Sequence, residues 1–157
     1  MLTLHGDLLK FAERGYFDAI IHGANCFCVM GAGIARQIRD RYPAAYRADC
    51  QTSKGDQLKL GTFSWAYIPN YNFIVINAYT QYGTNNRTNF QDLFDYDAFE
   101  QVLSKITNEF KGYRFGLPLI GAGLAGGDSD RIISIIEQFA VQVEQYNGSV
   151  SLVIRDS

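Results

Sequence analysis

Two glycine-rich loops constrain this chain most, because each follows an apolar run and precedes a helical pattern. The first loop, residues 30–35, reads Met-Gly-Ala-Gly-Ile-Ala and follows the apolar run 19–22. The second, residues 121–128, reads Gly-Ala-Gly-Leu-Ala-Gly-Gly-Asp and follows the run 115–120. Strand, glycine loop and helix in that order predict an α/β fold, in which strands alternate with helices.

The rest of the chain continues this alternation. Further apolar runs predict strands at residues 2–5, 62–67, 73–79 and 150–154. Apolar residues at helical spacing, with capping and turn residues at the ends, predict helices at residues 34–41, 44–53, 92–110 and 131–146. We therefore expect one α/β domain over residues 1–157, with three α/β/α layers and a central mixed sheet.

Composition narrows the functional classes. The chain has 14 Lys and Arg against 16 Asp and Glu, for a net charge of -2, so a nucleic-acid partner is not expected. No apolar run approaches the ~20 residues of a membrane helix, and the start of the chain lacks a signal-peptide pattern. We expect a cytoplasmic protein without a membrane partner. Its cysteines and histidines lack zinc-ligand spacing, and no metal is expected.

The two loops could bind a ligand by the same physical means. Glycine lets backbone N–H groups turn toward a ligand, and a helix amino terminus adds partial positive charge. Two such loops at neighbouring strand ends would hold a diphosphate between them. The alternative is that each loop is only a tight strand-to-helix turn. Residues 121–126 match G-x-G-x-x-G, but only one strand follows, which argues against a dinucleotide-dependent dehydrogenase.

The order of these motifs resembles the macro domain family over essentially the whole chain. The resemblance rests on Gly6-Asp7, Ala24-Asn25, the first loop, and the run 117–128 that contains the second. Within the family, the chain resembles the branch of small stand-alone domains that includes the ADP-ribose-1''-phosphate phosphatase and the terminal ADP-ribose glycohydrolase. The resemblance implies an ADP-ribose cleft at the strand ends and no cofactor.

The resemblance also implies roles for particular residues. Asp7 is expected to accept a hydrogen bond from the adenine amino group, with the backbone of Leu8 beside it. Asn25 is expected to meet the distal ribose. The loop residues expected to hold the diphosphate and riboses are Gly31, Ala32, Gly33, Ile34, Gly121, Ala122, Gly123, Leu124, Ala125 and Gly126.

Two residues are candidates for proton transfer. His22 titrates near neutral pH and is expected to position or deprotonate a water, and Asp128 is expected to act as a base. The alternatives are a His22 buried at a strand end and an Asp128 that only caps the last helix. The resembling glycohydrolase has a lysine near the end of the strand at 73–79 and an Asp after Gly-x-Gly-Leu. This chain has no lysine there and has Ala125.

The predicted function is a macro-domain hydrolase that removes phosphate from ADP-ribose 1''-phosphate. Two alternatives stay open. One is de-ADP-ribosylation, the removal of ADP-ribose from modified proteins or nucleic acid. The other is a non-catalytic reader of ADP-ribose on an ADP-ribosylated protein partner.

Overall fold

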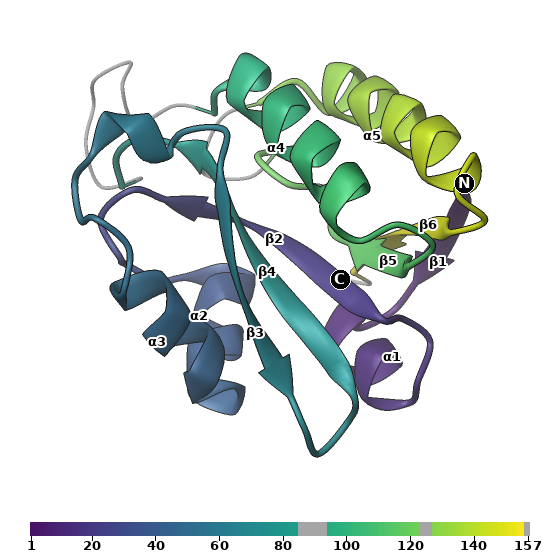
Figure 1. Cartoon of the computed structure of the whole chain (residues 1–157), viewed down its shortest axis with the longest axis horizontal. Helices are drawn as coiled ribbons and strands as arrows, with labels where there is room; N and C mark the ends of the chain where they lie inside the picture. The colour runs from purple at the N-terminus through teal and green to yellow at the C-terminus, as the bar shows by residue number, and fades with distance from the viewer. Residues whose placement is uncertain (85–93, 123–126, 156–157) are drawn as a thin grey trace.

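Six strands form one mixed sheet in the computed structural model, which describes residues 1–84, 94–122 and 127–155 (Figure 1). The strands are β1 (Leu2–His5), β2 (Ala19–Asn25), β3 (Phe63–Ile68), β4 (Phe73–Gln81), β5 (Arg114–Leu117) and β6 (Ser149–Ile154). Their order across the sheet is β1-β6-β5-β2-β4-β3. All neighbours are parallel except the antiparallel pair β3 and β4. The carboxyl ends of the five parallel strands therefore lie along the same side of the sheet.

Helices cover both faces of this sheet (Figure 1). One face carries α1 (Leu8–Glu13), α2 (Gly33–Arg41) and α3 (Pro43–Cys50), and the other carries α4 (Tyr96–Glu109) and α5 (Ser129–Glu144). A short 3-10 helix, η1 (Gln57–Lys59), precedes β3. Within the described ranges, no helix is long and apolar enough to cross a membrane. The predicted three-layer α/β/α fold with a central mixed sheet is confirmed.

The central strands are apolar throughout because both of their faces are buried. In β2, Ala19 and Ile21 pack in the core beneath α4 and α5, whereas Ile20 packs in the core beneath α1, α2 and α3. Strand β4 repeats this division with Ile76 on one side and Val75 on the other. Burying each large aliphatic side chain contributes about 1.5–3 kcal/mol. This two-sided burial explains why the sequence shows continuous apolar runs instead of strict alternation.

Several boundaries differ from the sequence predictions. Helix α1 was not predicted, because its 6 residues are too few to show a helical period. Strand β2 runs to Asn25, which was expected in the following turn. Pro43 occupies the first turn of α3, where its missing N–H costs nothing, and that helix ends at Cys50. Helix α5 begins at Ser129, with Asp128 as its N-cap.

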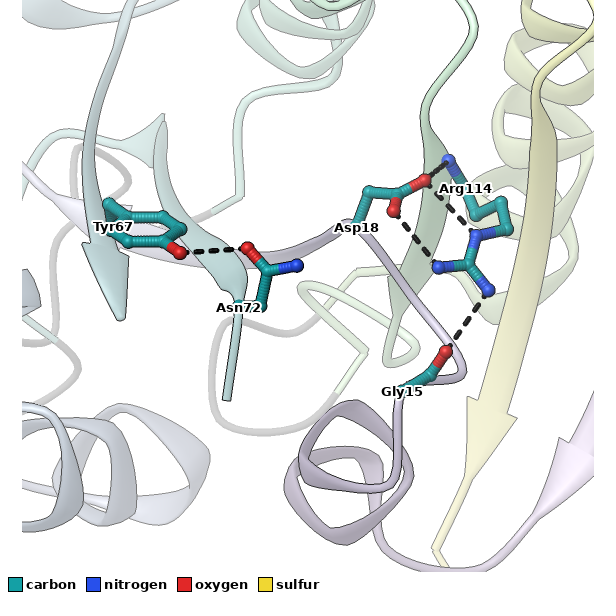
Figure 2. A network of polar contacts seen from close by, with 5 residues as sticks. All are labelled: Gly15, Asp18, Tyr67, Asn72 and Arg114. Atoms are coloured by element: carbon teal, nitrogen blue, oxygen red, sulfur yellow. Dashed lines mark hydrogen bonds and ion pairs between the residues drawn. The ribbon is translucent and has the colours of Figure 1, made fainter. Parts of the chain in front are cut away.

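At the amino-terminal ends of the strands, one ion pair joins β2 and β5 (Figure 2). The guanidinium of Arg114 donates to Asp18 through Nη2 at 2.9 Å and Nε at 3.1 Å, and to the Gly15 carbonyl at 3.0 Å. The same arginine holds the pKa of Asp18 below its ordinary value. Figure 2 also shows the Tyr67 hydroxyl donating to Asn72 at 2.7 Å across the turn between β3 and β4. These contacts belong to the scaffold, away from the glycine loops.

Candidate functional site

A cleft of about 480 Å³ lies at the carboxyl ends of β2, β4 and β5. In open α/β sheets, ligands bind in this position, outside the carboxyl ends of the strands. The cleft is lined by residues 23–25, 29–35, 80–81, 84 and 118–121. It thus brings the first glycine loop together with the start of the second.

A second hollow of about 440 Å³ lies between α4 and α5. Its floor is apolar, with Leu103, Ile135 and Phe139, and Glu100 is the one charged residue among the described residues that line it. Apart from Tyr146, its lining residues lie on α4 and α5, where N–H groups are already bonded within the helix. The cleft at the strand ends, with loops and a helix amino terminus, is therefore the candidate site.

One wall of the cleft is the amino terminus of α2. Ala32 is the N-cap and has no side-chain oxygen, so no side chain caps this helix, and its first turn holds no acidic residue. Gly33 has φ +56, a conformation that favours glycine. The first N–H groups of the helix therefore lack a side-chain partner beside the cleft, and an anion can accept from them. Gly31, Ala32, Gly33 and Ile34 all line the cleft.

The opposite wall is formed by residues 118–121. Gly121 has φ +81, and a Cβ there would lie 2.3 Å from the Phe94 ring, so no other residue fits without displacing that ring. The N–H of Gly127 donates to the Gly121 carbonyl at 2.8 Å and closes the loop. Ala122 packs against the core beneath α4 and α5. The predicted binding residues Gly123, Leu124, Ala125 and Gly126 lie outside the described residues.

Asn25 lies in the cleft and shapes the loop that follows β2. Its Oδ1 accepts from the N–H groups of Phe27 at 2.9 Å and Val29 at 3.4 Å, and its Nδ2 donates to the Val29 carbonyl at 2.8 Å. These bonds form an Asx-type turn, which is a common role for asparagine. Contact between Asn25 and a distal ribose stays a prediction.

Asp7 follows β1 at the same edge of the sheet, but it is not among the cleft-lining residues. Its Oδ1 accepts from the N–H groups of Leu9 at 2.9 Å and Lys10 at 3.2 Å, so Asp7 is the N-cap of α1. Leu8 is buried in the core, with 4% of the whole residue exposed. The adenine contact predicted for these two residues stays a prediction.

His22 is fully buried and does not line the cleft. Its Nε2 lies 2.6 Å from Oδ1 of Asn77, on the sheet face covered by α3. Burial lowers the pKa of His22 to about 4, although the bond to Asn77 favours the protonated ring. The Gly23 backbone also favours that form, but no acceptor or donor among the described residues meets Nδ1 in hydrogen-bonding geometry. The structure therefore places His22 behind the cleft, where burial favours the neutral ring.

The bond to His22 is the end of a buried polar network. Asn77 Nδ2 donates to Oγ of Ser64 at 3.0 Å, and that hydroxyl lies 2.8 Å from the Tyr79 hydroxyl. Tyr79 in turn donates to Oδ1 of Asp49 at 2.7 Å. Burial raises the pKa of Asp49, and the tyrosine bond opposes that shift. The network fixes β2, β3, β4 and α3 to one another behind the cleft.

Asp128 is exposed and caps α5. Its Oδ1 accepts from the N–H of Asp130 at 3.0 Å, and its own N–H donates to the Tyr96 hydroxyl at 2.7 Å. Asp128 is adjacent to Gly127, whose bond to Gly121 closes the second loop. It is not among the described cleft-lining residues. The capping alternative is thus observed, and the role of Asp128 as a base stays a prediction.

Sequence reasoning missed several cleft residues. Thr80 follows the apolar run of β4, and Pro118 and Leu119 follow β5. The available signal was positional. Each group comes at the carboxyl end of a parallel strand, where the ends of neighbouring strands converge.

A family model described as Macro domain matches residues 21–136 of the chain. The match spans more than half of the sequence and includes both glycine loops. The chain therefore belongs to the macro domain family.

A curated relative is similar to this chain over most of its length. An uncharacterized 17.5 kDa protein in the tk-vs intergenic region of Enterobacteria phage T4 is 32% identical over 151 residues, covering 90% of each chain. Solved structures with the same fold include the macrodomain of Mycobacterium tuberculosis DarG, with a TM-score of 0.68 at 22% identity, covering 99% of this chain and 98% of that one. Thermosipho africanus DarTG in complex with ADP-ribose has a TM-score of 0.76 at 15% identity, covering 98% of this chain and 42% of that one.

Proposed function

We propose that this protein binds ADP-ribose in the cleft between residues 31–35 and 118–121. The observation that carries the proposal is the amino terminus of α2, which lines the cleft without a side-chain cap or an acidic first-turn residue. Membership of the macro domain family supports it. So does the similar fold of Thermosipho africanus DarTG, which was solved in complex with ADP-ribose.

In the proposed complex, the diphosphate accepts hydrogen bonds from the first-turn N–H groups of α2 and from the second loop. Helix-terminal N–H groups and their dipole stabilise an anion without lysine, which suits a chain with net charge -2. Asp7 and the backbone of Leu8 receive the adenine. They follow β1, the edge strand, which lies three positions along the sheet from β2 and the proposed diphosphate site. Asn25 lies on the side of the distal ribose.

The finer proposal is that the protein removes phosphate from ADP-ribose 1''-phosphate. Water is the nucleophile, and the loop N–H groups stabilise the negative charge that develops on the phosphate. Asp128 is the candidate base, since it directly follows the loop that Gly121 and Gly127 close. His22 is buried behind the cleft, so its geometry favours support of β2 over direct contact with the substrate.

A reader of ADP-ribosylated protein is the second candidate. The observation that favours it is the state of the two predicted proton carriers. His22 is buried with its pKa lowered to about 4, and Asp128 uses a carboxylate oxygen to cap α5. A reader needs the same cleft without proton transfer.

Calorimetric titration with ADP-ribose tests the shared proposal, with AMP and NAD as control ligands. We expect selective binding of ADP-ribose, and no detectable binding would overturn the proposed function. Phosphate release from ADP-ribose 1''-phosphate then separates the enzyme from the reader. Release of ADP-ribose from a modified protein, with little activity on the 1''-phosphate, would favour de-ADP-ribosylation instead.

A further inference from the structure

Thr80 is the buried polar residue whose side chain meets the cleft, and no described contact accounts for its hydroxyl. It is 1% exposed at the carboxyl end of β4, and it lines the cleft. No hydrogen bond joins its hydroxyl to any part of the chain that the structure describes. Thr107, also buried, donates to the Leu103 carbonyl at 2.8 Å, as buried hydroxyls normally do. The Thr80 hydroxyl is thus available to a molecule that fills the cleft.

Gly23 makes room for this hydroxyl. A Cβ at position 23 would lie 2.9 Å from Oγ1 of Thr80 and 2.8 Å from Cγ2 of Ile120. Both distances are too short for a real side chain, so only glycine lets these two residues come together on the cleft floor. The floor therefore presents one hydroxyl beside one apolar side chain, between the two loops that form the walls.

The strand order places Thr80 relative to the ligand. Asp7 follows β1, and β4 lies four positions further along the sheet. Four strand spacings amount to about 19 Å. Helix α2 contacts β2, and the amino terminus of α2 lines the same cleft as the carboxyl end of β2, which lies between these two strands in the sheet. With adenine at Asp7 and the diphosphate at α2, as the proposed function has them, the part of the ligand that reaches β4 is the distal ribose.

We propose that the Thr80 hydroxyl hydrogen-bonds a hydroxyl group of the distal ribose and makes the cleft prefer ADP-ribose to ADP. This inference rests on the proposed function, because it requires ADP-ribose in the cleft. It assigns recognition of the distal ribose to a side chain on the cleft floor. The walls, made of backbone N–H groups, recognise the diphosphate that both ligands share.

The test compares Thr80→Val with wild type by calorimetric titration with ADP-ribose and ADP. Valine keeps the shape and removes the hydroxyl. We expect Thr80→Val to weaken ADP-ribose binding about fivefold to tenfold, the usual effect of one hydrogen bond, and to leave ADP binding unchanged. Thr80→Ser restores the hydroxyl and should recover most of the ADP-ribose affinity. The matched control is Thr107→Val in α4, which removes a buried hydroxyl outside the cleft.

A second measurement needs no variant at Thr80. Wild-type protein is titrated with ADP-ribose analogues that lack the 2''- or the 3''-hydroxyl group, and one of these analogues should bind no more tightly than ADP.

Equal ADP-ribose affinity in wild type and Thr80→Val would overturn the inference, as would equal losses for ADP and ADP-ribose. If wild type binds ADP but gains nothing from the second ribose, the inference alone fails. If it binds neither ligand, the proposed function fails with it.

Discussion

The ring Nε2 of His22 lies 2.6 Å from Oδ1 of Asn77, and the two residues face each other in register across β2 and β4. Asn77 Nδ2 donates to the Ala45 carbonyl at 3.0 Å and to Ser64, which directs Oδ1 toward the histidine. His22 Nε2 therefore carries the proton, and Nδ1 is left without one in the neutral ring. This pair joins the two strands whose carboxyl ends line the cleft.

We predict that His22 makes the protein less stable as pH falls from about 6.5 to about 4. The unfolded chain binds this proton near the ordinary histidine pKa of 6.5, whereas the folded state binds it only near 4. Between these values the unfolded state holds more protons, so acid favours unfolding, by up to roughly 3 kcal/mol. Urea unfolding of wild type and His22→Gln from pH 7.5 to 4.5 measures the difference.

The comparison with His22→Gln isolates this residue. The raised pKa of Asp49 acts in the opposite direction, since a buried carboxyl is more stable when protonated, and it is present in both proteins. Parallel pH dependence in the two proteins would mean that His22 is not the group that titrates.

A negative charge at the start of α2 should separate stability from binding. Ala32→Asp supplies the missing N-cap oxygen and should stabilise the protein by about 1 kcal/mol. The same carboxylate competes for the N–H groups and repels a diphosphate, so we expect ADP-ribose affinity to fall about tenfold or more. Thermal unfolding and calorimetry measure the two effects. Gln138→Glu, at an exposed site in the middle of α5, adds the same charge away from the cleft and from either end of its helix, and should change neither. Undiminished binding by Ala32→Asp would contradict the proposed diphosphate site.

Asp128 can be tested with a variant that keeps its capping role. Asparagine caps helices about as well as aspartate but cannot act as a base. If Asp128 transfers a proton, Asp128→Asn should lower phosphate release from ADP-ribose 1''-phosphate about 100-fold or more, with little change in ADP-ribose binding. Asp128→Ala should also lose about 1 kcal/mol of stability. Normal turnover by Asp128→Asn would show that this carboxylate is only a cap.

The pair of Asp18 and Arg114 should give a small stabilising coupling. Both side chains are about half exposed, and solvent screening limits even a bidentate pair to about 1 kcal/mol. A double-mutant cycle with Asp18→Asn and Arg114→Met measures this coupling by urea unfolding. Because the pKa of Asp18 is lowered, the contribution is present above the ordinary value of 3.8 and is lost as pH falls below it. A coupling that persists at pH 2 would indicate that charge is not its origin.

The strand and helix patterns were sufficient to predict the layers of the fold. Both faces of β2 and β4 are buried, so their sequences are apolar without interruption, and α4 and α5 carry clear apolar stripes. Short elements were harder. Helix α1 is defined by the cap at Asp7 and by its packing against β2 and β5, neither of which has a periodic signature.

The candidate site also has parts that the sequence predicts and parts that it does not. The loop at residues 30–35 could be predicted from the sequence, because glycines between a strand and a helix pattern indicate backbone N–H groups turned toward a ligand. The position of His22 could not be predicted in this way. Its residue type suits proton transfer, but its place in β2 directs the ring under α3 toward Asn77, and neighbouring residues on a strand point to opposite faces.

Local information in this chain therefore sufficed for the α/β class, for its membership of the macro domain family and for the loops that bound the cleft. Which polar side chains reach the cleft was decided by tertiary structure. Thr80 and Gly23 lie 57 residues apart in the sequence. The parallel pairing of β2 and β4 nevertheless brings them together beside Ile120. Strand pairing is a long-range interaction, and no local pattern encodes which strands will be neighbours.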